Sequence, residues 1–118
     1  MLKIIDIGHK NYGLDTAIAI LESEVSKIIY NGESKAMKII HGHGTGALKD
    51  AVREWCAGQS GRFKAVIFGE NYDMFHHDSM AMRSTCGLPD DKDFGRQNSA
   101  VTYTVSYTHL TLPTILLV

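Results

Sequence analysis

Residues 38–46 read Lys38-Ile39-Ile40-His41-Gly42-His43-Gly44-Thr45-Gly46, an apolar run followed by three glycines at alternate positions. The apolar run predicts a buried β-strand, and the glycines predict a turn that opens a helix at about Thr45. Glycine has no Cβ, so the backbone of such a turn can approach an anion while the first amides of the helix point toward it. We therefore expect a phosphate group to be bound by Gly42, His43, Gly44, Thr45 and Gly46.

The segments on either side of this turn alternate between strand and helix patterns. Residues 2–7 form a short apolar run, and apolar residues recur at helical spacing from Leu14 until Asn31 and Gly32 end the helix. A second amphipathic helix follows the turn and ends near Gly58, and further strands are expected at 63–68 and 99–104. This order predicts an α/β domain with a mixed four-stranded sheet whose first strands are parallel.

A long polar insertion, residues 70–97, separates the last two expected strands. It is too long for a structureless hairpin loop and has enough apolar residues for a short helix, so a lid, a partner-binding flap and a surface excursion are all open. Residues 70–93 contain six acids and two bases, a net charge of −4, whereas the rest of the chain carries a net charge of +3. A mildly basic body is compatible with phosphate binding, and ordinary solvated surface charge explains the same pattern.

Length and composition limit the possible classes of protein. A chain of 118 residues is enough for one small domain with one core. Its longest apolar stretches are far shorter than the roughly 20 residues that span a bilayer, so we expect no membrane partner. Cys56 and Cys86 have no metal-type spacing, and we expect a cytoplasmic chain with reduced thiols.

The C-terminal residues have an unusual sequence. Residues 105–114 match, in order, the in-frame translation of a transposase end sequence used as a sequencing adapter. We therefore expect the natural domain to cover residues 1–104, and the tail 105–118 to be derived from the adapter. The natural C-terminus would then be missing, and a natural β-rich tail is the alternative interpretation.

Residues 38–55 resemble the core of the Smr (small MutS-related) domain family. That family carries an Ile-His-Gly-x-Gly-Thr-Gly-x-Leu segment followed by an amphipathic helix, and residues 40–48 match every position of it. The resemblance implies a βαβαββ two-layer sandwich in which two helices cover one face of the sheet. It also implies that the domain binds DNA or RNA, and that it could act as an endonuclease that nicks DNA or cleaves RNA.

A second family motif, Leu-Asp-x-His-Gly, belongs at the end of the first strand. Here Asp6 matches the aspartate, but Gly8 occupies the position of the histidine, and His9 follows one residue later. Because strand side chains alternate between faces, this shift would point His9 away from the family's histidine position unless a bulge at Gly8 restores it.

The resemblance implies roles for individual residues. His41 would act as acid or base in phosphodiester cleavage, and Asp6 would orient a histidine such as His9, a water or a divalent cation. Contacts to the nucleic-acid backbone would come from Lys38, Lys49 and Arg53. Without the resemblance, the favoured interpretation of His41 is a histidine hydrogen-bonded into the turn.

Several functional alternatives stay open at the level of sequence. No residues are assigned as metal ligands, and no cofactor is required, although a divalent cation would fit the chemistry. A non-catalytic module that binds nucleic acid or a ribosomal surface is one alternative, and a small enzyme that uses the turn for a nucleotide is another. The sequence does not distinguish DNA from RNA as the partner, and it does not indicate an oligomeric state.

Overall fold

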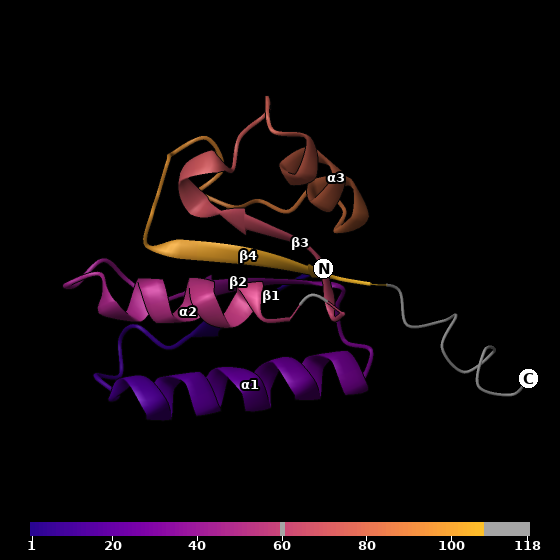
Figure 1. Cartoon of the computed structure of the whole chain (residues 1–118). Coiled ribbons are helices and arrows are strands. Elements are labelled where there is room, and N and C mark those ends of the chain that lie inside the picture. Colours follow the sequence, from indigo (N-terminus) through magenta and orange to yellow (C-terminus); the bar gives the residue numbers. More distant parts are fainter. Residues whose placement is uncertain (60, 108–118) are drawn as a thin grey trace, which may run out of the picture.

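The computed structural model describes residues 1–59 and 61–107. Within them, the expected strands and the two expected helices are present, and two further short helices lie in the insertion (Figure 1). The elements in chain order are β1 (Leu2–Asp6), α1 (Leu14–Tyr30), β2 (Ala36–Ile40), α2 (Ala47–Ala57), β3 (Phe63–Phe68), the 3-10 helix η1 (Gly69–Asn71), α3 (His77–Thr85) and β4 (Val101–Ser106).

The four strands form one mixed sheet in the order β1-β2-β4-β3. β1 runs parallel to β2, and β4 runs antiparallel to both β2 and β3, which confirms the predicted sheet. Residue Ile40 at the end of β2 pairs with Asp6 on one side and with Val101 on the other. The ends of β1 and β2 and the start of β4 therefore meet at one edge of the sheet.

Helices α1 and α2 cover one face of this sheet, as expected (Figure 1). The buried residues of α1 are Ala17, Leu21, Val25 and Ile28, whose spacing of three to four places them on one side of the helix. They pack with Met37 of β2 and with Val52 of α2 in a single apolar cluster, and burial of these side chains is the main stabilising term of this layer. The helix ends where Gly32 adopts a φ of 66°.

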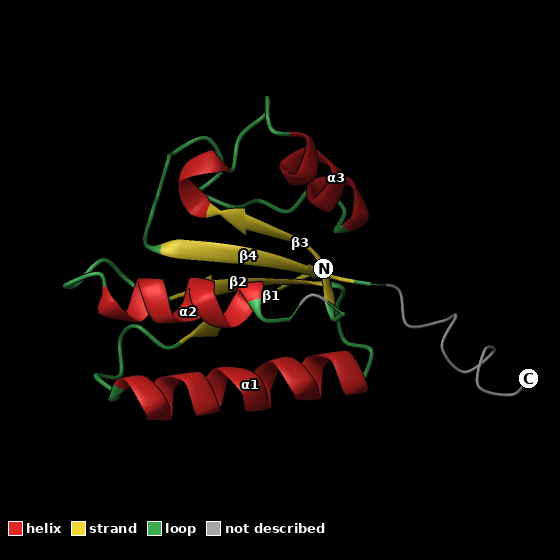
Figure 2. Cartoon of the chain, viewed as in Figure 1, coloured by secondary structure: helices red, strands yellow, loops and turns green. Residues whose placement is uncertain are grey.

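The insertion packs on the opposite face of the sheet and adds a third layer to the expected two (Figure 2). Tyr72 and Met82 are fully buried there. The ring of Tyr72 lies 4.2 Å from that of Tyr103 on β4 and 5.1 Å from that of Phe94, measured between centroids. The insertion is thus a folded layer with its own apolar core.

A cluster of buried polar groups fastens the end of the insertion to the sheet. The ammonium of Lys38 on β2 lies 2.7 Å from Asp91 Oδ1 and 2.6 Å from Asp93 Oδ2. Tyr103 donates its hydroxyl to the other oxygen of Asp91 at 2.7 Å, and Asn98 donates its amide to the other oxygen of Asp93 at 2.8 Å. Each carboxylate oxygen of the pair therefore has a partner, as a buried charge requires.

The domain boundary expected after Thr104 falls inside β4. Val105 pairs with Ala36, and Ser106 pairs with Phe63, so these two residues continue the strand. Residues 108–118 lie outside the described residues. The adapter origin of residues 105–118 stays a prediction.

Candidate nucleic-acid interface

The glycine turn, residues 41–46, has a regular alternation of backbone conformation. Gly42, Gly44 and Gly46 have φ values of 78°, 46° and 90°, whereas His43 and Thr45 between them have no positive φ. Alternation of left-handed and right-handed backbone is the pattern in which successive N–H groups can converge on an anion. The amides of His43, Gly44 and Thr45 have no hydrogen-bond partner among the described residues. The turn therefore presents unpaired donors to solvent.

Helix α2 begins directly after this turn and adds to its positive potential. Gly46 is the residue before the helix, and its amide donates to the carbonyl of His43 at 2.8 Å. Thr45 accepts a hydrogen bond from the amide of Ala47 through its hydroxyl, at 3.3 Å. Lys49 stands half-buried in the first turn, and the free end of the helix dipole favours an anion at the same place.

The loop after β1 lies against the glycine turn. The amide of Ile7 donates to the carbonyl of Ile40 at 3.0 Å, which continues the pairing beyond Asp6. A Cβ on Gly8 would lie 2.8 Å from the carbonyl carbon of His41 and 2.9 Å from its oxygen. Only glycine fits this close approach without a shift of backbone, so Gly8 brings the two loops together.

Asp6 and His9 form a side-chain pair in this loop. The carboxylate of Asp6 accepts hydrogen bonds from the amides of Gly8, at 3.0 Å, and of His9, at 3.3 Å, and lies 2.6 Å from Nδ1 of His9. Partial burial raises the pKa of Asp6, but the hydrogen bonds from His9 and Gly8 outweigh it and hold that pKa below its ordinary value. The side chain of His9 is 76% exposed, and its Nε2 has no partner within the described part of the chain.

His41 is held inside the turn. Its Nδ1 lies 3.0 Å from the carbonyl oxygen of Gly42, which can only accept, so Nδ1 donates. Its Nε2 lies 2.9 Å from Oγ1 of Thr102, which also accepts from Nε of Arg53 at 3.0 Å. A neutral ring with its proton on Nδ1, accepting from the threonine hydroxyl, satisfies every group.

Burial lowers the pKa of His41 below its ordinary value, and the charges of Arg53 and Lys49 act in the same direction against the raising effect of Gly42. The residue is 4% exposed. The lowered pKa favours the neutral form of His41, and both ring nitrogens are engaged within the protein in this conformation.

Among the described residues, the predicted cationic contacts divide into one unpaired and two engaged side chains. Arg53 forms a bidentate pair with Glu70, with Nη1 and Nη2 at 2.9 Å and 2.7 Å from the two carboxylate oxygens, and its guanidinium lies 4.0 Å from the ring centre of Phe68. Lys38 faces the insertion and is neutralised by Asp91 and Asp93. The structure does not bring Lys38 to the turn, because the insertion buries it. Of the three, Lys49 alone stays available beside the glycines.

Comparison with known proteins places these features in a family. The family model described as the Smr domain matches residues 10–72, which include the glycine turn and both helices of the first layer. The chain belongs to the Smr domain family. Among solved structures, the Smr domain of MutS2 from Thermus thermophilus is similar, with a TM-score of 0.59 and 17% sequence identity, and the match covers 90% of this chain and 99% of that one. No curated protein matches the sequence significantly.

The stretch expected to match the second family motif precedes the residues that the family model matches. Gly8, at the position where the resemblance led us to expect a histidine, packs on the backbone of His41, while His9 turns back onto Asp6. The carboxylate of Asp6 accepts hydrogen bonds from the amides of Gly8 and His9, and these bonds fix a bend after Asp6. The bend brings His9 to Asp6, whereas a continued strand would have pointed His9 away.

Two cations beside the turn were not expected from the sequence of this Smr domain. His43 of the turn and the end of the insertion line an open polar hollow of about 490 Å³. The remaining lining residues are Lys92, Asp93, Arg96, Gln97 and Asn98. The sequence did not single out Lys92 and Arg96, because the insertion is acidic on average. In the structure, Asp91 and Asp93 are paired with the buried Lys38 and so do not pair with these two cations.

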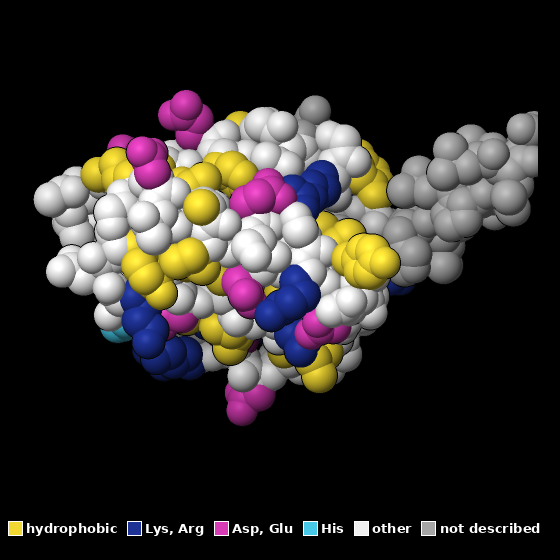
Figure 3. Space-filling model, turned by 90° about the horizontal axis from the view of Figure 1, so that it is seen from below, with side chains coloured by type: hydrophobic (Ala, Val, Ile, Leu, Met, Phe, Trp, Pro, Cys, Tyr) yellow, Lys and Arg dark blue, Asp and Glu magenta, His cyan; other side chains and the backbone are white. Residues whose placement is uncertain are grey.

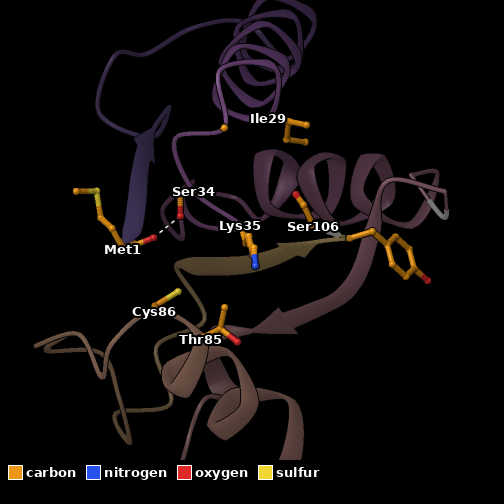
Figure 4. A pocket seen from close by; sticks show the side chains of 9 residues that line it. Met1, Ile29, Ser34, Lys35, Thr85, Cys86 and Ser106 are labelled. Atoms are coloured by element: carbon orange, nitrogen blue, oxygen red, sulfur yellow. Dashed lines mark hydrogen bonds between the residues drawn. The ribbon is translucent and has the colours of Figure 1, made fainter. Parts of the chain in front are cut away.

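The face of the Smr domain that α1 covers offers less to a polyanion. Figure 3, seen from the side of α1, shows lysine and arginine side chains in separate groups among acidic and hydrophobic ones. A second hollow, of about 230 Å³, lies at the opposite end of the sheet (Figure 4), where the Ser34 hydroxyl donates to the carbonyl of Met1. Lys35 is the only charged side chain among the described residues that line it.

Among the described residues 1–59 and 61–107, no group of three or more histidine, cysteine, aspartate or glutamate side chains gathers to hold a metal ion. His76 and His77 do not form such a group, since His76 caps α3 by accepting from the amide of Ser79. In the same part of the chain, every helix is too short or too polar to cross a membrane.

The lowered pKa of His41 predicts a specific dependence of stability on pH. In the unfolded chain His41 takes up a proton near pH 6.5, whereas in the folded chain it does so only at lower pH. The contribution of the neutral His41 to the free energy of unfolding is therefore complete above pH 6.5 and is lost as pH falls. We expect the free energy of unfolding to decrease from pH 7.5 to pH 5.5, by at most about 1.4 kcal/mol per pH unit from this one proton. Urea unfolding of the wild type and of His41→Gln measures it, and an equally steep decrease in the variant would contradict the assignment.

Proposed function

We propose that this Smr domain binds nucleic acid through the glycine turn, with a backbone phosphate held by the amides of residues 43–45. The observation that supports this most is the set of unpaired N–H groups on an exposed turn with alternating φ, directly before the N-terminus of α2. Such donors recognise a phosphate and not a base, so the binding would be sequence-independent at this point.

Family membership supports the same proposal, because Smr domains generally bind nucleic acid. Lys49, Lys92 and Arg96 have no ion-pair partner among the described residues, and all three belong to the turn or to the hollow beside it. A strand that crosses the turn would thus meet uncompensated positive charge on more than one side. The choice between DNA and RNA is left to the experiment.

Salt-dependent binding tests the proposal. Fluorescence anisotropy with labelled single- and double-stranded DNA and RNA should show binding at low salt that weakens as salt rises, with a logarithmic slope of about −0.7 to −0.9 for each phosphate contacted. Absence of binding to all four polymers at low salt would refute the proposal. Binding to mononucleotides with equal affinity would favour a small nucleotide-dependent enzyme instead.

Phosphodiester cleavage is a second candidate function, favoured by the Asp6–His9 pair. The ring of His9 lies 2.6 Å from a carboxylate with a lowered pKa, points its second nitrogen to solvent, and belongs to the loop that touches the glycine turn. An imidazole oriented by an aspartate can transfer a proton to or from a reacting group, as hydrolysis of a phosphodiester requires. If cleavage is absent while binding is present, the domain is a non-catalytic binding module.

A further inference from the structure

The polar hollow between the glycine turn and residues 92–98 has the composition of an anion site. Its six lining residues are all polar or charged, and its volume of about 490 Å³ lies in the range typical of small-ligand sites. Lys92 and Arg96 are exposed, and neither has an ion-pair partner within the described residues. His43 contributes from the turn itself, with its Nδ1 3.3 Å from the hydroxyl of Ser99.

The acid that lines this hollow does not cancel its positive charge. Asp93 is 6% exposed, and both of its oxygens are occupied, one by the ammonium of Lys38 and the other by the amide of Asn98. The side-chain oxygen of Asn98 accepts a hydrogen bond from the amide of Ala100 at 2.9 Å. The charges left facing the hollow are therefore those of Lys92 and Arg96, and an incoming anion meets no competing carboxylate from the lining residues.

The segment that carries these two cations is fixed from behind. Asp91 is held by Lys38 and Tyr103, and the amide of Gly95 donates to the carbonyl of Tyr72 at 2.8 Å. Phe94 packs edge-on against Tyr72, with ring centres 5.1 Å apart. Because the backbone on both sides of Lys92 and Arg96 is anchored in the core, little ordering is needed when an anion binds between them and the turn.

We propose that this hollow holds a second backbone phosphate of the strand whose neighbouring phosphate occupies the glycine turn, so that the insertion extends the nucleic-acid interface. This inference rests on the proposed function of the turn. It assigns to the insertion, through Lys92 and Arg96, a direct part in binding.

The test is the double substitution Lys92→Ala/Arg96→Ala in the full chain, measured with labelled single-stranded DNA and RNA of about 12 nucleotides, a length within known binding-site sizes. We expect affinity at low salt to fall at least about tenfold, and the logarithmic salt slope to become shallower by about one to two. The matched control, Lys35→Ala/Lys64→Ala, removes two exposed charges at the opposite end of the sheet and should leave both quantities unchanged.

The outcomes separate the inference from the function on which it rests. If the wild type binds and the Lys92/Arg96 variant keeps its affinity and slope, the inference is refuted while the function of the turn stands. If the wild type does not bind any polymer, both are refuted. Inorganic phosphate and a mononucleotide serve as competitors. Displacement of the polymer by either one at low concentration, lost in the double variant, would assign the hollow to a small ligand and overturn the proposal. Circular dichroism verifies that both double variants are folded.

Discussion

Lys38→Met is expected to lower the free energy of unfolding by about 3–5 kcal/mol, a large share of the stability of a domain of this size. The side chain of Lys38 is only 7% exposed, and its ammonium is shared by Asp91 at 2.7 Å and Asp93 at 2.6 Å. Methionine has nearly the length of lysine without the charge, so the change removes the cation but fills much of the space. Two buried carboxylates are then left without compensation.

The pKa values of Lys38 and Asp93 indicate that these two groups form an ion pair in the folded chain. Burial lowers the pKa of Lys38, but the hydrogen bonds that its ammonium donates to Asp91 and Asp93 outweigh this effect and raise that pKa above its ordinary value. Burial raises the pKa of Asp93, but the contacts with Lys38 and Asn98 outweigh this effect and hold the pKa of Asp93 below its ordinary value. The destabilisation should therefore be largest near neutral pH, where Asp93 would carry its charge without a cation beside it.

A triple substitution provides the matched control for this prediction. In Lys38→Met/Asp91→Asn/Asp93→Asn no buried charge is left without a partner, while Tyr103 and Asn98 keep their acceptors, so most of the lost stability should return. Urea unfolding followed by Trp55 fluorescence and by circular dichroism measures all three proteins. If Lys38→Met lowers the free energy of unfolding by less than about 1 kcal/mol, well under the range for a broken buried ion pair, the cluster does not anchor the insertion.

His9→Ala is expected to reduce phosphodiester cleavage by about 10²–10⁴-fold, the usual effect of losing a general acid or base. We propose this role for His9 because its ring is exposed and its Nδ1 lies 2.6 Å from the carboxylate of Asp6. Nucleic-acid affinity should change little, since the phosphate donors are backbone amides of the turn. Relaxation of supercoiled DNA and cleavage of labelled RNA measure the rate.

The control for this change is His77→Ala, which removes a 94% exposed histidine at the start of α3. If the His9→Ala variant cleaves nucleic acid at the wild-type rate, the Asp6–His9 pair takes no part in the mechanism. His41→Ala is less informative, because His41 joins Gly42 to Thr102 and its loss should weaken the turn itself.

Much of the fold was predictable because it follows from local patterns. The helical spacing of Leu21 and Val25, the apolar run before His41, and the alternating glycines each depend on residues close together in the chain. The mixed sheet followed from the order of these elements, since strand–helix–strand units impose parallel pairing. These are the features that the structure and the Smr family confirm.

The parts that could not be predicted depend on contacts between residues far apart in the chain. Lys38 was expected to contact the nucleic-acid backbone, but its partners Asp91 and Asp93 lie more than 50 residues later in the chain, where no local pattern reveals them. The insertion buries Tyr72, Met82 and Phe94, which have no regular spacing that would indicate a packed face. The contact of His9 with Asp6 depends on a bend that alternation along a strand does not describe.

The most direct test of the central claim compares Gly44→Asp with Gly44→Asn in nucleic-acid binding at low salt. Gly44 has a φ of 46°, and a side chain there would meet no atom within 4 Å. Aspartate and asparagine both tolerate this backbone conformation and have the same shape, so the pair differs by one negative charge at the phosphate donors. The control variant is Gly32→Asp, which places the same charge just after the C-terminal end of α1. Gly32 has a φ of 66° and open space beside it.

If the glycine turn holds a backbone phosphate, Gly44→Asp should bind at least about tenfold more weakly than Gly44→Asn, a difference of about 1.4 kcal/mol, and Gly32→Asp should bind like the wild type. Equal affinities for the two Gly44 variants, with binding intact, would contradict the account, because a carboxylate among the proposed donors would then have left the polyanion undisturbed.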